Sequence, residues 1–170
     1  MKEPQSSPHR EPQSWPHNAM SAKEEKLLAK HEVGTVVVSC IDFRFRKQLP
    51  NAIFQTFGID DYDDPKLAGG AKNIASPDDD GRRKAILDDI ALALDKHRAK
   101  QILLLTHQNC GKYAAEGHDF TDPDDERAFH EKELRLAVDI TFSHFHDAKI
   151  LLCYVWVDRD DTVRIDQIKP

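Results

Sequence analysis

The sequence has little of what would place a protein in a membrane, outside the cell or on nucleic acid. No run approaches the ~20 apolar residues that a membrane-spanning helix needs, and the N-terminus lacks the apolar stretch of a secretory signal. The formal net charge is -6, from 24 basic against 30 acidic residues, and no dense basic stripe offsets it. Because a phosphate backbone would be repelled, we expect no nucleic-acid partner, and the lack of a long apolar run predicts no membrane partner.

Cysteine is also scarce. Three cysteines are an odd number and too few for a disulfide scaffold, so we expect a reducing, cytoplasmic setting. We therefore ask whether these thiols bind a metal or take part in catalysis. The length of 170 residues suits one domain.

The N-terminal segment differs from the rest. Residues 1–20 hold a short repeat and four prolines, which preclude a regular helix, and we expect a flexible tail there. From Ser21 the pattern becomes helical, since Ser21 is a plausible N-cap and Glu24 follows three residues later, as in a capping box. Residues 21–170 are then expected to form a single α/β domain.

Hydrophobic runs predict the strands of this domain. Four short apolar runs are typical of strands buried on both faces: 34–39, 52–57, 101–106 and 149–157. Residues 162–168 alternate apolar and polar side chains, which indicates an edge strand with one wet face. The acidic stretch 158–161 before it is a candidate hairpin turn.

Helices are expected in the gaps between these strands. Ser76 with Pro77, and Asp122 with Pro123, have the chemistry of helix starts, and apolar side chains follow each at helical spacing. Helical connections between buried strands imply parallel pairing with right-handed crossovers. The predicted fold class is α/β, with a mainly parallel β-sheet flanked by helices and a C-terminal antiparallel edge hairpin.

Polar residues follow two of the predicted strands directly. The first strand runs into Cys40, Asp42 and Arg44, and the third runs into His107 and Cys110. The carboxyl ends of parallel strands are where open α/β sheets place their sites. Two thiols and one imidazole could meet there, which makes three ligands of a tetrahedral zinc site with one position left open.

Asp42 and Arg44 are alternate residues, so on extended backbone their side chains point the same way. A carboxylate pairs readily with a guanidinium, and this pairing keeps Asp42 ionised and holds its side chain in one orientation. Asp42 could then accept a hydrogen bond from a zinc-bound water, or bind the metal itself and close the site. The sequence leaves both states open.

These two motifs together resemble the β-class carbonic anhydrases over about residues 33–168. The resemblance implies that Cys40, His107 and Cys110 are the Zn2+ ligands and that Asp42 and Arg44 form the catalytic dyad. It also implies a mainly parallel α/β fold and a homodimer or higher homo-oligomer, in which an N-terminal helix wraps the partner.

The resemblance further implies a reaction, the zinc-dependent hydration of carbon dioxide to bicarbonate, which is a lyase activity (carbonate dehydratase). Zinc lowers the pKa of bound water from 15.7 toward roughly 7, and the metal-bound hydroxide attacks carbon dioxide. In this scheme Asp42 orients the nucleophile, and Arg44 holds Asp42.

Three departures from the family pattern point to a remodelled substrate pocket. Phe43 stands where the family has a small Ser, residues 67–70 only echo its Arg-Asn-Ala-Gly segment, and residues 58–66 are strongly acidic near the expected approach. Three alternatives therefore stay open: a related substrate such as carbon disulfide or carbonyl sulfide, a non-catalytic zinc-binding member of the same fold, and a thiol enzyme that uses Cys110 as nucleophile with His107 nearby.

Other candidate residues have simpler interpretations. Cys153 lies in an apolar run and is predicted to be a packed core thiol. His118 and His130 could shuttle protons, but nothing in the sequence singles them out.

Overall fold

The computed structural model describes residues 21–169, so the predicted tail at 1–20 lies outside the described residues. The chain divides into two units, one up to Lys30 and one from His31 onward. In the first unit, α1 (Ala22–Leu28) has the predicted capping box: the hydroxyl of Ser21 accepts the N–H of Glu24 at 3.3 Å, and the Glu24 carboxylate accepts the N–H of Ser21 at 2.7 Å. None of the residues of α1 is buried.

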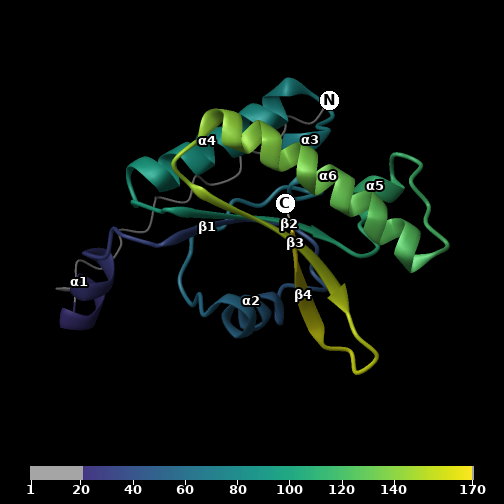
Figure 1. The fold of residues 1–170 in the computed structure, drawn as a ribbon. Helices are drawn as coiled ribbons and strands as arrows, with labels where there is room; N and C mark the ends of the chain where they lie inside the picture. Colours follow the sequence, from purple (N-terminus) through teal and green to yellow (C-terminus); the bar gives the residue numbers. More distant parts are fainter. Residues whose placement is uncertain (1–20, 170) are drawn as a thin grey trace, which may run out of the picture. The chain divides into compact units, whose positions relative to one another are not determined.

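The second unit is built on one four-stranded sheet with the order β1-β2-β3-β4 (Figure 1). The strands are β1 (Thr35–Val38), β2 (Gln101–His107), β3 (Lys149–Val157) and β4 (Val163–Ile168). The first three pair in parallel, and β4 pairs antiparallel with β3. The predicted fold class, with its C-terminal edge hairpin, is confirmed.

The strand predicted at 52–57 is wrong, because this segment is part of helix α2 (Leu49–Phe57). Pro50 fits the first turn, where its missing N–H costs nothing. Gly58 ends the helix in a left-handed conformation, with φ of 69°. Ala52 and Ile53 are buried and follow the buried first residue of the helix at helical spacing.

Four further helices connect the strands: α3 (Lys72–Ala75), α4 (Asp80–Asp95), α5 (Gly111–Ala114) and α6 (Pro123–His144). The predicted start of α6 is confirmed, since Asp122 caps it by accepting the N–H of Asp124 at 2.7 Å. Helix α4 begins later than its predicted start at Ser76, because Asp79 is the residue that caps it.

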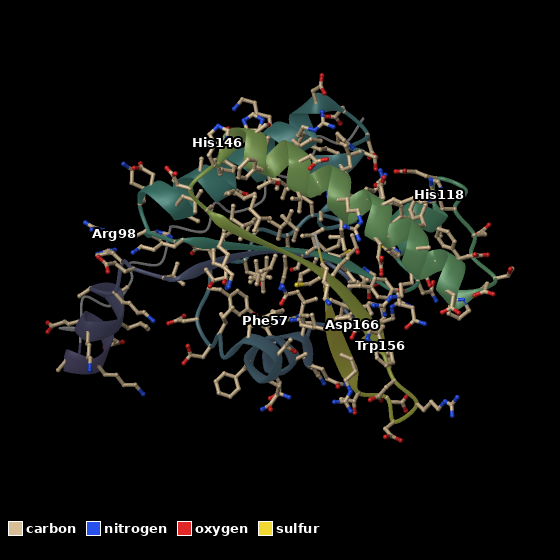
Figure 2. The ribbon with its side chains drawn as sticks, viewed as in Figure 1. Phe57, Arg98, His118, His146, Trp156 and Asp166 are labelled. Atoms are coloured by element: carbon tan, nitrogen blue, oxygen red, sulfur yellow. The ribbon has the colours of Figure 1, made fainter. Side chains whose placement is uncertain are left out.

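The two faces of the sheet carry separate cores. Helices α3, α4 and α6 cover one face, where Val36, Val38 and Leu104 are buried (Figure 1). Helix α2 lies against the other face, over a core that includes Cys153, which has no exposed surface, as predicted for a core thiol. Phe57, labelled in Figure 2, packs against this second core.

None of the helices in the part of the chain that the structure describes combines the length and the apolar character needed to cross a bilayer.

Candidate metal centre

The parallel register brings the carboxyl ends of β1 and β2 to the same edge of the sheet, with Val38 opposite Leu104. Cys40 follows the end of β1, His107 is the last residue of β2, and Cys110 is the N-cap residue of α5. One ligand atom from each of these three side chains lies within 4.8 Å of the others. The structure therefore brings together the three residues that the sequence pattern singled out.

The imidazole of His107 is oriented for ligation. Its Nδ1 lies 2.9 Å from the carbonyl oxygen of Gln108, which can only accept, so the ring proton belongs on Nδ1. Nε2 is buried and has no hydrogen-bond partner, so its lone pair is free to bind a metal. The ring packs against Phe45, with 4.7 Å between centroids, and this contact fixes its plane.

The two thiols form a close pair. The hydrogen bond from Cys110 lowers the pKa of Cys40 to about 4, and the same contact raises the pKa of Cys110. The backbone N–H of Gly69 also donates to Sγ of Cys40, at 3.2 Å. Because the thiolate is the ligand form of cysteine, this pair with an unpartnered imidazole nitrogen fits a zinc ion.

The segment 67–70 approaches the site with its backbone. Gly70 has φ of 57°, and a Cβ added there would lie 2.6 Å from the carbonyl oxygen of Leu105 and 3.2 Å from the nitrogen of Cys40. The N–H of Ala71 donates to that Leu105 oxygen at 3.1 Å. The backbone of this segment thus passes close to β2 and to Cys40 at Gly70, where a side chain does not fit.

Asp42 lies beside the three candidate ligands. Its Oδ1 accepts the backbone N–H and the Nε–H of Arg44, both at 3.0 Å, and its Oδ2 accepts the Nη2–H at 2.7 Å. Oδ2 also lies 3.9 Å from Nε2 of His107. The hydrogen bonds from Arg44 lower the pKa of Asp42, so the carboxylate is ionised at the edge of the site.

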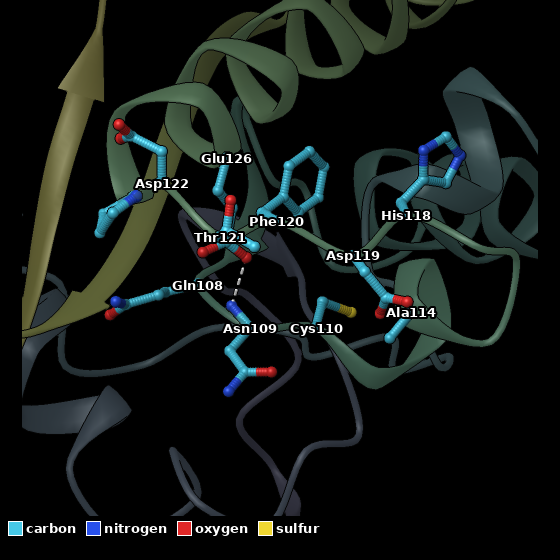
Figure 3. A pocket seen from close by; sticks show the side chains of 11 residues that line it. Gln108, Asn109, Cys110, Ala114, His118, Asp119, Phe120, Thr121, Asp122 and Glu126 are labelled. Atoms are coloured by element: carbon cyan, nitrogen blue, oxygen red, sulfur yellow. Dashed lines mark hydrogen bonds between the residues drawn. The ribbon is translucent and has the colours of Figure 1, made fainter.

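Arg44 reaches the second strand end as well. Its Nη2 donates to the carbonyl oxygen of Asn109 at 2.6 Å. The N–H of Asn109 donates in turn to Oε1 of Glu126 at 2.5 Å, the contact drawn as a dashed line in Figure 3. Sequence reasoning missed Glu126, because no local motif connects the first turn of α6 to this loop.

Phe43 and the acidic stretch 58–66 are the other two departures from the family pattern. Phe43 is 82% exposed, so its ring does not fill the space between the candidate ligands. The acidic stretch 58–66 is partly engaged in structural contacts. Asp63 pairs with His97 at 2.8 Å, and Asp64 accepts the hydroxyl of Ser39 at 2.9 Å.

A polar pocket lies next to Cys110, between the loop after β2 and the start of α6 (Figure 3). His118 is one of its lining residues, together with Glu126 and Asp122. The pocket shares Cys110 with the candidate ligand set, so it adjoins that set.

His130 lies deeper, with no exposed surface and no hydrogen-bond partner for either ring nitrogen. Its neighbours are aromatic rings, with Tyr113 at 4.9 Å and Tyr154 at 5.4 Å between centroids. Burial lowers the pKa of His130 to about 3, so the ring is neutral at physiological pH. A neutral buried ring does not fit the proton shuttle considered from the sequence.

Comparison with known families identifies the class of protein. Residues 29–168 match the family described as "Putative carbonic anhydrase". Because this match spans most of the chain, the protein belongs to that family.

Two curated relatives carry no assigned function. One is an uncharacterized protein of Rickettsia bellii, 31% identical over 94 residues, which are 55% of this chain and 57% of the relative. The chain thus matches less than two thirds of that relative's length. The other is an uncharacterized protein of Rickettsia conorii, 26% identical over 141 residues, which are 82% of this chain and 76% of the relative.

Solved structures show the same fold at low sequence identity. A carbon disulfide hydrolase has a TM-score of 0.53 at 17% identity, over 84% of this chain and 85% of that one. The carbonic anhydrase of Streptococcus mutans has a TM-score of 0.52 at 15% identity, over 89% and 100%. A tetrameric β-carbonic anhydrase of Sordaria macrospora has a TM-score of 0.54 at 16% identity, over 86% of each.

Proposed function

We propose that this chain is a zinc-dependent lyase that hydrates carbon dioxide to bicarbonate. The observation that carries the proposal is the group of Cys40, His107 and Cys110, whose ligand atoms lie within 4.8 Å of one another beside the ionised Asp42. Membership of a carbonic anhydrase family supports the same reaction.

In this proposal the three grouped residues hold one zinc ion through two thiolates and Nε2 of the imidazole. A bound zinc ion supplies a Lewis acid that lowers the pKa of water from 15.7 toward roughly 7. The protein keeps His107 in the ligating tautomer through the Gln108 carbonyl.

Asp42 orients the attacking water. An ionised carboxylate can only accept hydrogen bonds, so it holds a water with one O–H toward Oδ2 and a lone pair toward the substrate carbon. Arg44 holds both carboxylate oxygens in a fork and cannot itself act as a base. The dyad thus fixes the direction of attack.

A related sulfur substrate is the second candidate. Phe43 and the altered segment 67–70 change the surroundings of the family's site, and one of the structures with the same fold is a carbon disulfide hydrolase. The same ligands and the same orienting carboxylate would serve hydrolysis of carbon disulfide. A non-catalytic zinc-binding protein is the outcome if neither substrate reacts.

The thiol-enzyme alternative has less support. Cys110 is only 4% exposed, and its contact with Cys40 raises its pKa, so it is a poor nucleophile near neutral pH.

We further propose that the protein works as a homodimer or higher homo-oligomer. Ile41 and Phe43 are 63% and 82% exposed beside the site, and a second copy would cover such apolar side chains. The expected location is the cytoplasm, because the three cysteines are free thiols.

The test is a comparison of substrates on one preparation of known zinc content. Stopped-flow hydration of carbon dioxide and release of hydrogen sulfide from carbon disulfide are measured side by side. Hydration in clear excess supports the proposal. Sulfide release in excess moves the assignment to the second candidate, and no turnover with zinc bound contradicts both.

A further inference from the structure

We propose that Glu126, on the first turn of α6, is a positioning residue that holds Arg44, and through it Asp42, in the geometry of the site. The expected effect of Glu126 on the rate of carbon dioxide hydration rests on the proposed function. The expected effect on the position of Arg44 rests on the contacts alone. The connection runs from the Glu126 carboxylate to the backbone of Asn109 and from there to the guanidinium.

The backbone of Asn109 links Glu126 to Arg44. Its φ is 52°, in the left-handed region that asparagine adopts more readily than most other non-glycine residues. Here the N–H of Asn109 donates to Glu126 at 2.5 Å, and its carbonyl oxygen accepts from Arg44 at 2.6 Å. The N–H and the carbonyl group of Asn109, which belong to the two peptide groups on either side of its Cα, are thus each held by a charged side chain.

The burial of Glu126 shows that this carboxylate is not a general surface acid. The residue is 6% exposed, whereas its neighbours Asp124 and Asp125 on the same turn are exposed. A buried carboxylate needs hydrogen-bond donors, and the N–H of Asn109 supplies one. His130 lies 3.6 Å from Oε1, but its neutral ring makes no hydrogen bond there.

The connection crosses three separate parts of the chain. Arg44 follows β1, Asn109 follows β2, and Glu126 belongs to α6. The side chain of Arg44 is 41% accessible. Besides Asp42 and the Asn109 carbonyl, its guanidinium contacts the ring of Phe45, with Cζ 5.8 Å from the ring centroid. Loss of the Glu126 carboxylate would release the N–H of Asn109, so the carbonyl oxygen of the same residue would hold the guanidinium less firmly.

The test replaces Glu126 with residues of similar size. Glu126→Met removes the acceptor and keeps most of the volume. Glu126→Gln keeps an acceptor oxygen and serves as the conservative rescue. Asp125→Asn removes one charge from an exposed position on the same turn and is the matched control.

The primary readout is the NMR resonance of the Arg44 Nε–H group, assigned by its loss in Arg44→Lys. We expect it to shift in Glu126→Met and to stay in place in Glu126→Gln and in Asp125→Asn. An unchanged resonance in Glu126→Met, or an equal shift in Asp125→Asn, would overturn the proposal.

Kinetics give the second readout on zinc-loaded protein. We expect kcat for carbon dioxide hydration in Glu126→Met to fall roughly 10- to 100-fold with unchanged zinc content and unchanged KM, as for a displaced catalytic group. A loss confined to KM or to zinc content would contradict a positioning role.

A reciprocal experiment covers the case in which Glu126→Met does not fold. In Arg44→Lys, changed at the exposed end, the Asn109 amide resonance and the carboxyl carbon resonance of Glu126 should both shift. Unchanged resonances there overturn the proposal. If the wild-type protein hydrates no carbon dioxide and these resonances still move together, the proposed function fails and the positioning role stands.

Discussion

Oδ2 of Asp42 lies 3.9 Å from Nε2 of His107, while the same oxygen accepts a hydrogen bond from Nη2 of Arg44 at 2.7 Å. The carboxylate is thus held from one side by a guanidinium and presented to the candidate ligand set from the other. Arg44 therefore orients the Asp42 carboxylate, whereas His107 is one of the candidate metal ligands.

Substitution of Asp42 tests the orienting role. We expect Asp42→Asn to lower the rate of carbon dioxide hydration by roughly 10²-fold or more, because the neutral amide has only one acceptor oxygen and cannot serve both the Arg44 fork and the oriented water. Zinc content should stay near that of the wild type. The control is Asp60→Asn, which changes an exposed acid in the 58–66 segment. Equal rates in wild type and Asp42→Asn would remove Asp42 from the mechanism.

The ligand assignment predicts which cysteines matter for metal. Cys40→Ala and Cys110→Ala should each lower bound zinc from about one per chain to near zero, since two protein ligands hold zinc poorly. Cys153→Ala removes a fully buried thiol from the core under α2 and should keep its zinc. Elemental analysis after gel filtration measures all three, and full zinc in either of the first two variants would refute the assignment.

Gly70 should tolerate no side chain, because its backbone passes close to both strand ends. Gly70→Ala meets the Leu105 carbonyl oxygen at 2.6 Å in addition to the left-handed strain of its φ of 57°. Gly58→Ala has a similar φ of 69° but open space around the added Cβ, so it carries the conformational cost alone, about 1–2 kcal/mol. We expect Gly70→Ala to lose about 2 kcal/mol more in urea unfolding. Equal losses would show that the close approach relaxes freely.

Burial of His130 predicts an acid-sensitive stability. Its pKa is about 3 in the folded chain against an ordinary value near 6.5, so between these pH values the unfolded chain binds more protons. The free energy of unfolding should therefore fall as pH drops from 6.5 toward 3, by up to about 1.4 kcal/mol per pH unit from this group.

His130→Phe keeps a ring among the neighbouring aromatic side chains and removes the titration. Its unfolding free energy should depend less steeply on pH across that window, whereas the exposed His144→Gln should keep the wild-type slope. Parallel pH dependences for wild type and His130→Phe would contradict a neutral buried imidazole.

The sequence predicted the four strands of the sheet, because buried parallel strands appear as short continuous apolar runs. It failed at 52–57, where six apolar-rich residues fit a strand as well as a helix. The deciding signals were the flanking Pro50 and Gly58, which mark a helix start and a helix end. The short helices α3 and α5, each four residues long, have no periodicity to detect.

The candidate site was predictable where its chemistry is local. Cys40, Asp42 and Arg44 share one loop, His107 and Cys110 share another, and parallel pairing brings the loops together. The backbone contacts were not predictable in the same way. The hydrogen bond from the N–H of Gly69 to Sγ of Cys40 depends on tertiary packing, which no local sequence motif indicates. The Glu126 contact likewise joins a helix to a loop that is distant in sequence.

The most direct test of the account is the rate of carbon dioxide hydration as a function of bound zinc per chain. Protein stripped with a chelator is reloaded in steps, and stopped-flow rates are measured at each step. The account predicts a rate that rises in proportion to zinc, reaches its maximum near one ion per chain and vanishes without metal. A chain that holds one zinc ion and hydrates no carbon dioxide, or one that hydrates it equally well without zinc, would contradict the account.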